Sequence, residues 1–287
     1  ELPLFSVFVN LIVIPALPVV FISGLLASAA GCFGVMPGKL LVFPAFAVLK
    51  LYEVLCSLVM KLPGASVITG APDGYRIFLF YAVMSGFWVA FSLKKRAIEC
   101  GSKEKGQILY SVQRAVCTAV LLAILLVKPK TAAQLDILDV GQGDGILVET
   151  PDNHHFLIDG GSSSQSDLGR YCLLPALKSQ GISYLDGLFI SHTDKDHISG
   201  AKELLEYMGN GLTTIRAGYL VLPSWAEKPE AWEELSDAAQ KAGIKIVTGK
   251  KGDELHCGLV SFSILWPEKN ATGKDVNEEA MVMELSF

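Results

Sequence analysis

The sequence predicts a multi-pass α-helical membrane region followed by an α/β soluble domain. Residues 2–38 contain no charged side chain, and further apolar runs continue to residue 127, whereas about 20 apolar residues suffice to cross a bilayer. From residue 134 short strand-like runs alternate with helix-like runs, which is typical of sheets layered with helices. We therefore expect a membrane region over residues 1–130, with three to four membrane-associated helices, and a soluble domain over residues 131–287.

Composition limits the function classes that fit the chain. The net charge of −5 argues against a protein that coats nucleic acid through general basicity. The six cysteines are scattered, so we interpret them as small buried apolar residues and expect neither a zinc ribbon nor a disulfide framework. Because the chain begins at Glu1 without an initiator methionine and ends at Phe287 inside a strand-like run, we expect an internal piece of a longer protein.

The first two apolar segments contain features that a simple membrane span does not need. Asn10, Pro15 and Pro18 interrupt residues 2–38, which predicts either a helix broken beside a transport path or a helix with a proline kink. In residues 40–60 and just beyond, a narrow polar stripe recurs at helical spacing, formed by Lys50, Glu53, Ser57 and Lys61. This helix could lie at the interface, span the membrane or line a pore, and Lys50 and Glu53 could also simply pair with each other.

Two further spans are expected at residues 77–93 and 108–127. The loop between them is rich in lysine and arginine over residues 94–105. Cytoplasmic loops carry such an excess of positive charge. The last helix therefore runs outward, and we expect a multi-pass protein of the cell membrane whose soluble domain lies on the outer face.

The soluble region predicts a series of short elements. Helices are expected at residues 173–180, 199–208 and 230–242. Strands are expected at residues 134–140, 145–150, 155–158, 185–190, 219–222, 244–248 and 259–265, with a further strand-like run at 280–287. Strands and helices in this mixture indicate an α/β sandwich.

The run from His192 to His197 concentrates the chemistry of the chain. It holds two histidines and two aspartates within six residues, on an expected turn between strand and helix. His192 and Asp194 would project to one side and Asp196 and His197 to the other, so two metal ions could share the cluster. Such a pair suits hydrolysis of a phosphodiester, with Asp196 as the group that orients the nucleophilic water. The carboxylate at Asp194 favours Mn²⁺ or Mg²⁺ over strict Zn²⁺; the alternative is a polar surface loop without a metal.

Three motifs give the chain a family resemblance. They are LDVGQGD at residues 138–144, LIDGG at 157–161 and SHTDKDH at 191–197. The last resembles the HxHxDH signature of the metallo-β-lactamase fold, with Asp194 in place of the second histidine. Together the motifs resemble the C-terminal domain of ComEC competence proteins, and Asn10 with its following prolines resembles the membrane region of that family.

The resemblance implies a fold, a function and partners. The fold is an αββα sandwich that binds divalent metal, with two ions of Mn, Mg or Zn expected. The function is that of a bacterial inner-membrane channel that conducts one DNA strand inward while the soluble domain degrades the other. The implied partners are DNA, the lipid bilayer and other proteins of the competence machinery. Asp159, followed by Gly160 and Gly161, matches an aspartate that supports the metal ligands or shapes the turn.

The chain departs from that fold in one respect. The fold completes its metal site with an aspartate in a Gly-Asp step and a histidine in a His-His-Gly run, and neither motif occurs in these 287 residues. We expect His154 and His155 in a hairpin turn and a structural role for His256. The chain as it stands is therefore expected to bind metal weakly and to turn over little. Two alternatives stay open, a membrane-tethered hydrolase of a lactone or thioester and a non-catalytic transport or scaffold protein with a vestigial metal loop.

Overall fold

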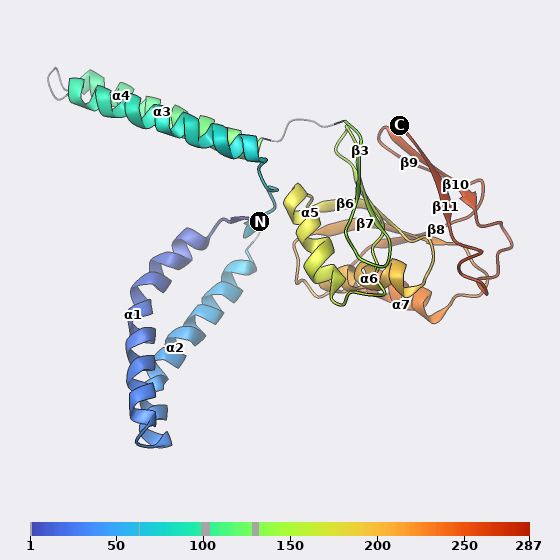
Figure 1. The fold of residues 1–287 in the computed structure, drawn as a ribbon, viewed down its shortest axis with the longest axis horizontal. Helices are drawn as coiled ribbons and strands as arrows, with labels where there is room; N and C mark the ends of the chain where they lie inside the picture. The colour runs from blue at the N-terminus through green and yellow to red at the C-terminus, as the bar shows by residue number, and fades with distance from the viewer. Residues whose placement is uncertain (1, 63, 99–103, 128–131) are drawn as a thin grey trace. The chain divides into compact units, whose positions relative to one another are not determined.

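The computed structural model describes residues 2–62, 64–98, 104–127 and 132–287, with side chains outside residues 93–110. The chain forms two compact units, Glu1–Ile68 and Thr69–Phe287. The first unit is a helical hairpin, and the second contains a pair of helices and a layered α/β domain (Figure 1). The boundary expected near residue 130 divides the membrane region from the soluble domain, and it stays a prediction.

The first helix is continuous in spite of its prolines. Helix α1 runs over Ser6–Gly31 and contains Pro15 and Pro18, so the structure has a proline-containing helix and no break. The Tyr52 hydroxyl of helix α2, Val35–Met60, donates a hydrogen bond of 2.7 Å to the Val13 carbonyl oxygen. This bond joins the two helices close to the two prolines.

Among the residues that the structure describes, three helices are long and apolar enough to cross a membrane. They are Ser6–Gly31, Val35–Met60 and the part of helix α3 over Gly74–Ser92. In helix α2 Lys50 and Glu53 are both exposed and pair at 2.6 Å, which is the local explanation of the polar stripe. The short strands β1, Leu2–Pro3, and β2, Ser66–Val67, close this unit as an antiparallel pair.

Helices α3, Gly74–Ile98, and α4, Glu104–Leu126, lie side by side (Figure 1). Arg76 is only 4% exposed, and its guanidinium donates to the carbonyl oxygens of Ile124 and Val127. A cation at the carboxyl end of a helix satisfies carbonyls that have no partner within that helix. Arg76 therefore ties the beginning of α3 to the end of α4. Of the basic stretch at 94–105, residues 99–103 and all side chains lie outside the described part.

A six-stranded sheet organises the soluble domain. Its order is β3-β4-β5-β6-β7-β8, with antiparallel pairing from β3 to β5 and parallel pairing from β5 to β8. The strands are β3 Gln134–Ile137, β4 Gly145–Glu149, β5 His155–Asp159, β6 Tyr184–Phe189, β7 Arg216–Pro223 and β8 Lys245–Gly249. The carboxyl ends of β5 and β6 lie at the same edge of the sheet because the two strands are parallel.

A smaller antiparallel sheet packs on one face of the large sheet. It is formed by β9 Glu254–Cys257, β10 Val260–Trp266 and β11 Val282–Ser286, in the order β11-β10-β9. Phe262 of β10 stacks on Phe189 with ring centroids 4.4 Å apart and meets Phe156 edge-on at 4.9 Å. These rings are buried with neighbouring aliphatic side chains, so an aromatic core joins the two sheets.

Helices cover the opposite face (Figure 1). They are the π-helical turn η1 Gly169–Leu173, α5 Leu174–Gln180, α6 Lys195–Gly209 and α7 Glu230–Lys241. Because side chains alternate along a strand, Leu157 and Leu188 point away from the aromatic core towards this side. Both leucines are fully buried, as are Leu204 of α6 and Leu235 of α7. The result is the helix, sheet, sheet layering that the sequence predicted in outline.

Some expectations for individual segments were wrong. Strand β3 ends at Ile137 and helix α6 begins at Lys195, four residues before the expected start, because Asp194 supplies the extended residue that precedes a helix. Strand β9 was not expected, since its sequence Glu-Leu-His-Cys is short and half polar. The cysteines were expected to be buried, but none of the five that the structure describes is buried.

Candidate metal centre

Asp159 joins the ends of the two central strands. It is the last residue of β5, and Ser191 follows β6 by two residues. One carboxylate oxygen of Asp159 accepts the Ser191 backbone N–H at 2.8 Å, and the other accepts the Ser191 hydroxyl at 2.7 Å. Asp159 is buried and has a φ of 56°, a backbone conformation that is uncommon outside glycine. These bonds hold the aspartate in that conformation and aim it at the segment that follows β6.

The predicted turn carrying the His/Asp run is partly helical. Asp194 has extended backbone, and its carbonyl oxygen accepts the His197 N–H at 2.9 Å, which begins helix α6. Asp196 and His197 therefore lie in the first helical turn, where a carboxylate is favourable because the helix dipole is positive there. The expectation that all six residues form a turn was wrong. The first half of the run has extended backbone before the helix, and the second half is helical.

Glycines allow three segments to meet at this helix start. A Cβ at Gly161 would lie 2.5 Å from backbone atoms of Asp196 and His197, so a side chain has no room there. The Gly160 N–H donates to the His197 carbonyl oxygen at 2.9 Å, and the Asp144 N–H donates to that of Asp196 at 3.1 Å. Gly160 and Gly161 thus act through backbone packing, which brings the three sequence motifs together.

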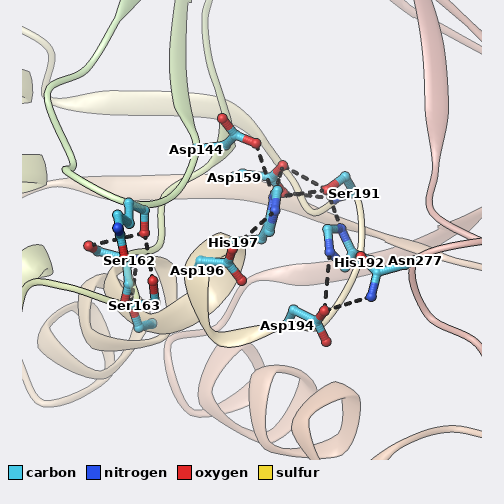
Figure 2. Close-up of polar contacts among 12 residues, drawn as sticks. Asp144, Asp159, Ser162, Ser163, Ser191, His192, Asp194, Asp196, His197 and Asn277 are labelled. Carbon is cyan, nitrogen blue, oxygen red and sulfur yellow. Dashed lines mark hydrogen bonds and ion pairs between the residues drawn. The ribbon is translucent and has the colours of Figure 1, made fainter.

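Each histidine of the run faces its own aspartate. His192 Nε2 lies 3.7 Å from an Asp194 carboxylate oxygen, and His197 Nε2 lies 4.0 Å from one of Asp196. The centroids of the two imidazole rings are 3.9 Å apart. Figure 2 shows the two side chains next to each other. The four side chains named from the sequence thus form two neighbouring pairs.

The other ring nitrogen of each histidine is held by a neighbouring side chain. His197 Nδ1 lies 3.0 Å from an Asp159 carboxylate oxygen, and His192 Nδ1 lies 3.0 Å from the Ser191 hydroxyl (Figure 2). Histidines that bind metals are oriented in this way, because a partner on one nitrogen fixes the ring and leaves the other nitrogen to coordinate. In both residues the nitrogen left over is Nε2, which is the one that faces an aspartate.

The environment moves the pKa values of the two histidines in opposite directions. Burial lowers the pKa of His192, and the nearby His197 lowers it further. The hydrogen bond to Asp159 raises the pKa of His197. His192 is consequently favoured as a neutral imidazole, which is the form that binds metals, whereas His197 keeps a proton on the side of Asp159.

The carboxylates outnumber the cations that pair with them. Asp144 lies 3.7 Å from His197 Nδ1, so four aspartates surround the two imidazoles: Asp144, Asp159, Asp194 and Asp196. In the described part of the chain, the ion pairs that these aspartates make are with histidine. This donor set fits a divalent cation, which would neutralise the excess charge.

The ligand atoms of the His/Asp run lie near one another but do not converge on a single position. They do not form a group of three within 4.8 Å of one another among the described residues, whereas His154, Asp186 and Cys257 do. Sequence reasoning also missed Asn277, whose amide donates to the Asp194 carboxylate at 2.8 Å (Figure 2). Asn277 carries no motif signal, because it reaches the site from a loop more than 80 residues later. Ser191 and Asp144 lie inside the recognised motifs, but their contacts with the histidines could not be predicted from the sequence alone.

A family model and solved structures are similar to the soluble domain. The metallo-beta-lactamase superfamily model matches residues 138–267, which include both central strands and the His/Asp run. The domain thus has a fold that implies binding of a divalent metal. A Bacillus subtilis metallo-beta-lactamase fold protein of known crystal structure, YhfI, is 18% identical, with a TM-score of 0.35, covering 53% of this chain and 58% of that one.

Two curated relatives are competence-related by name. ComE operon protein 3 of Bacillus subtilis (strain 168) is 32% identical over 165 residues, which are 53% of this chain and 20% of that protein. Competence protein ComA of Neisseria gonorrhoeae is 29% identical over 113 residues, which are 39% of this chain and 14% of that protein. The chain is thus similar to ComEC-type competence proteins and spans a fifth or less of the length of these two.

Proposed function

We propose that this chain is part of an integral membrane protein that internalises DNA in natural transformation, with a metal-dependent nuclease-like domain. The observation that carries the proposal is the pairing of His192 with Asp194 and of His197 with Asp196, each imidazole held through Nδ1. This pairing lies at the carboxyl ends of β5 and β6, in the same chain as helices of membrane-spanning length. The similarity to competence proteins supports DNA as the substrate.

The proposed metal ligands are His192, Asp194, Asp196 and His197. We assign one ion to His192 with Asp194 and a second to Asp196 with His197, because each Nε2 faces a different carboxylate. The carboxylates suit Mn²⁺ or Mg²⁺, and the imidazoles also suit Zn²⁺. A bound divalent pair supplies a water of lowered pKa and positive charge beside a phosphodiester. Asp196, 43% exposed at its side chain, can orient that water and accept its proton.

The division of labour follows from the two parts of the chain. Residues 1–130 would belong to the region that conducts one DNA strand, and residues 131–287 would degrade the strand that is not transported. The proposal includes DNA, the lipid bilayer and other competence proteins as partners. The domain's basis for holding DNA is the metal pair, since the net charge of −5 offers no general attraction for phosphates.

We also propose that the soluble domain lies on the outer face of the cell membrane. The lysines and arginines of residues 94–105 support this orientation, because they favour the cytoplasmic side. Protease added to intact spheroplasts should then degrade an epitope placed after Phe287 and spare one inserted at residues 99–103. Protection of the first epitope, with digestion of the second, would reverse the orientation.

The test of the nuclease assignment uses the full gene in its own cells. Duplex DNA labelled in both strands is added to competent cells, and the nucleotides released into the medium are counted. With Asp196→Ala we expect the release rate to fall by about 10²–10⁴-fold, which is the usual contribution of a positioned acid or base. Asp237→Ala, an exposed carboxylate on α7, is the matched control and should leave the release unchanged.

The alternatives predict different results in the same experiment. A hydrolase of lactones or thioesters would leave nucleotide release unchanged in Asp196→Ala. A transport protein with a vestigial metal loop would show neither a loss of release nor a loss of transformation in that variant. Either result would overturn the proposed nuclease role.

A further inference from the structure

A second group of ligand-type side chains lies at the opposite ends of the same strands. His154 ends the turn before β5, Asp186 lies in the first half of β6, and Cys257 ends β9. His154 Nδ1 is 2.8 Å from Asp186 Oδ1 and 3.4 Å from Cys257 Sγ, and the sulfur is 4.0 Å from the same carboxylate oxygen. We call these three residues the strand-start cluster. It is about 16 Å from Asp159, since five residues of strand at ~3.3 Å each separate the two ends.

The neighbours of the cluster fix two of its ligand atoms. The second carboxylate oxygen of Asp186 accepts the His155 backbone N–H at 2.8 Å, which leaves Oδ1 for the cluster. His154 Nε2 lies 3.7 Å from Asp152, and the Leu259 backbone N–H holds that carboxylate at 2.7 Å. The imidazole thus has a carboxylate near its outer nitrogen, while Nδ1 faces Asp186 and Cys257.

The three ligand atoms face one another, and the sulfur is only weakly bonded. When Nδ1 of His154 donates to Asp186 it cannot accept the Cys257 thiol, so the contact of 3.4 Å between Nδ1 and the sulfur is at most a weak, shared hydrogen bond. The remaining contact, from the Cys257 sulfur to Asp186 at 4.0 Å, is at the outer limit of a sulfur hydrogen bond. A cation at the common point of the three atoms would satisfy all of them at once.

We propose that His154 Nδ1, Asp186 Oδ1 and Cys257 Sγ form a metal site for Zn²⁺ or a cation of similar preference. Tetrahedral bonds of about 2.0–2.3 Å place ligand atoms roughly 3.3–3.8 Å apart. The separations of 2.8, 3.4 and 4.0 Å bracket this range, so shifts of rotamers within the cluster suffice to receive an ion. One thiolate, one imidazole and one carboxylate suit zinc, whereas the His/Asp run without sulfur suits harder ions.

The fold indicates what such an ion would do. Asp186 belongs to the six-stranded sheet, and His154 belongs to the turn that leads into it. Cys257 belongs to the small sheet. An ion bound to all three would join the two sheets at the edge remote from the His/Asp run. Asp186 and Cys257 also line a cavity of about 330 Å³ with aromatic walls, which leaves room for water as a fourth ligand. This inference does not depend on the proposed nuclease function.

The test uses Co²⁺ as the probe, added to the whole 287-residue chain in detergent. A thiolate bound to Co²⁺ gives a near-ultraviolet charge-transfer absorption that imidazole and carboxylate ligands do not give. We expect one equivalent of this absorption in the wild-type chain and its loss in Cys257→Ser. Cys172→Ser, which changes another half-buried cysteine, is the matched control and should keep the absorption.

Two further variants separate this site from the His/Asp run and from misfolding. His192→Ala combined with His197→Ala should leave the thiolate absorption intact. His154→Gln should weaken Co²⁺ binding at the cluster by at least about tenfold while the circular dichroism spectrum is unchanged. The proposal is overturned if the wild-type chain binds Co²⁺ without thiolate absorption, or if that absorption survives Cys257→Ser.

Discussion

The two ends of strands β5 and β6 carry two ligand groups of different kinds. At the carboxyl ends, the His/Asp run places its residues within one stretch of six, supported by Asp159. At the amino ends, the strand-start cluster takes one residue from each of three distant segments. The first group is rich in carboxylates and suits hard ions, and the second contains a thiol and suits zinc. The two ends of these strands thus carry a candidate reactive site and a candidate structural site, the second shared with the small sheet.

The difference also concerns which layer holds each site. The His/Asp run depends on helix α6 and on the glycines that let loops approach it. The strand-start cluster depends on the small sheet, because Cys257 lies on β9. Disturbing one layer should therefore damage one site more than the other.

The largest effect is expected from loosening the small sheet with Phe262→Ala. Phe262 is 1% exposed and packs against Phe189 and Phe156, so the truncation should cost about 3–5 kcal/mol of unfolding free energy. Urea unfolding of the chain in detergent, followed by tryptophan fluorescence, measures this. The thiolate absorption should weaken, whereas Mn²⁺ binding at the His/Asp run should persist. Leu265→Ala, on the exposed side of the same strand, is the control. An equal loss in both variants would contradict the aromatic core described above.

A smaller, more selective effect is expected from Asp159→Ala. Removing the carboxylate frees His197 Nδ1 and the Ser191 backbone, so the affinity of the His/Asp run for Mn²⁺ should fall by about 10–100-fold. Isothermal titration with Mn²⁺ gives the affinity. The Co²⁺–thiolate absorption should not change, and its loss together with Mn²⁺ binding would mean that the two ends are not independent.

Asn277→Ala should affect the same end less. The amide holds one Asp194 carboxylate oxygen, but Asp194 is 43% exposed at its side chain and water can replace the amide. The expected loss of Mn²⁺ affinity is below about tenfold. If the loss equals that of Asp159→Ala in the same titration, the loop that carries Asn277 is as important as the strand end.

The smallest effect concerns stability near the small sheet at acid pH. The backbone N–H groups of Thr272 and Gly273 lower the pKa of Glu279. Because the pKa of Glu279 is lower in the folded state than its value near 4.5 in the unfolded state, its ionised carboxylate stabilises the fold at any pH above 4.5. That stabilisation is lost as the pH falls through the pKa of the folded state. Glu279→Gln should therefore reduce the unfolding free energy at pH 7 by less than about 1 kcal/mol, with no reduction at pH 2. A constant difference at both pH values would show that the charge of Glu279 is unimportant.

The sequence predicted more of the carboxyl ends than of the amino ends, for physical reasons. The His/Asp run and the DGG turn are local patterns, so their positions after strands follow from the order of residues alone. The mixture of strand-like and helix-like runs also predicted the layered α/β domain. The strand-start cluster was not foreseen, because Asp186 is separated from His154 by 32 residues and from Cys257 by 71, and each looks ordinary in its own segment. Asn277 was missed for the same reason.

The central claim is that the His/Asp run binds divalent metal, and Mn²⁺ titration of the whole chain tests it most directly. The electron paramagnetic resonance signal of free Mn²⁺ falls as the ion binds, and a hard ion of this kind avoids the thiol of the strand-start cluster. We predict saturable binding in the wild-type chain and in His256→Ala, and its loss when His192 and His197 are both changed to alanine. Undiminished binding in that double variant, or no saturable binding in the wild-type chain, would contradict the account.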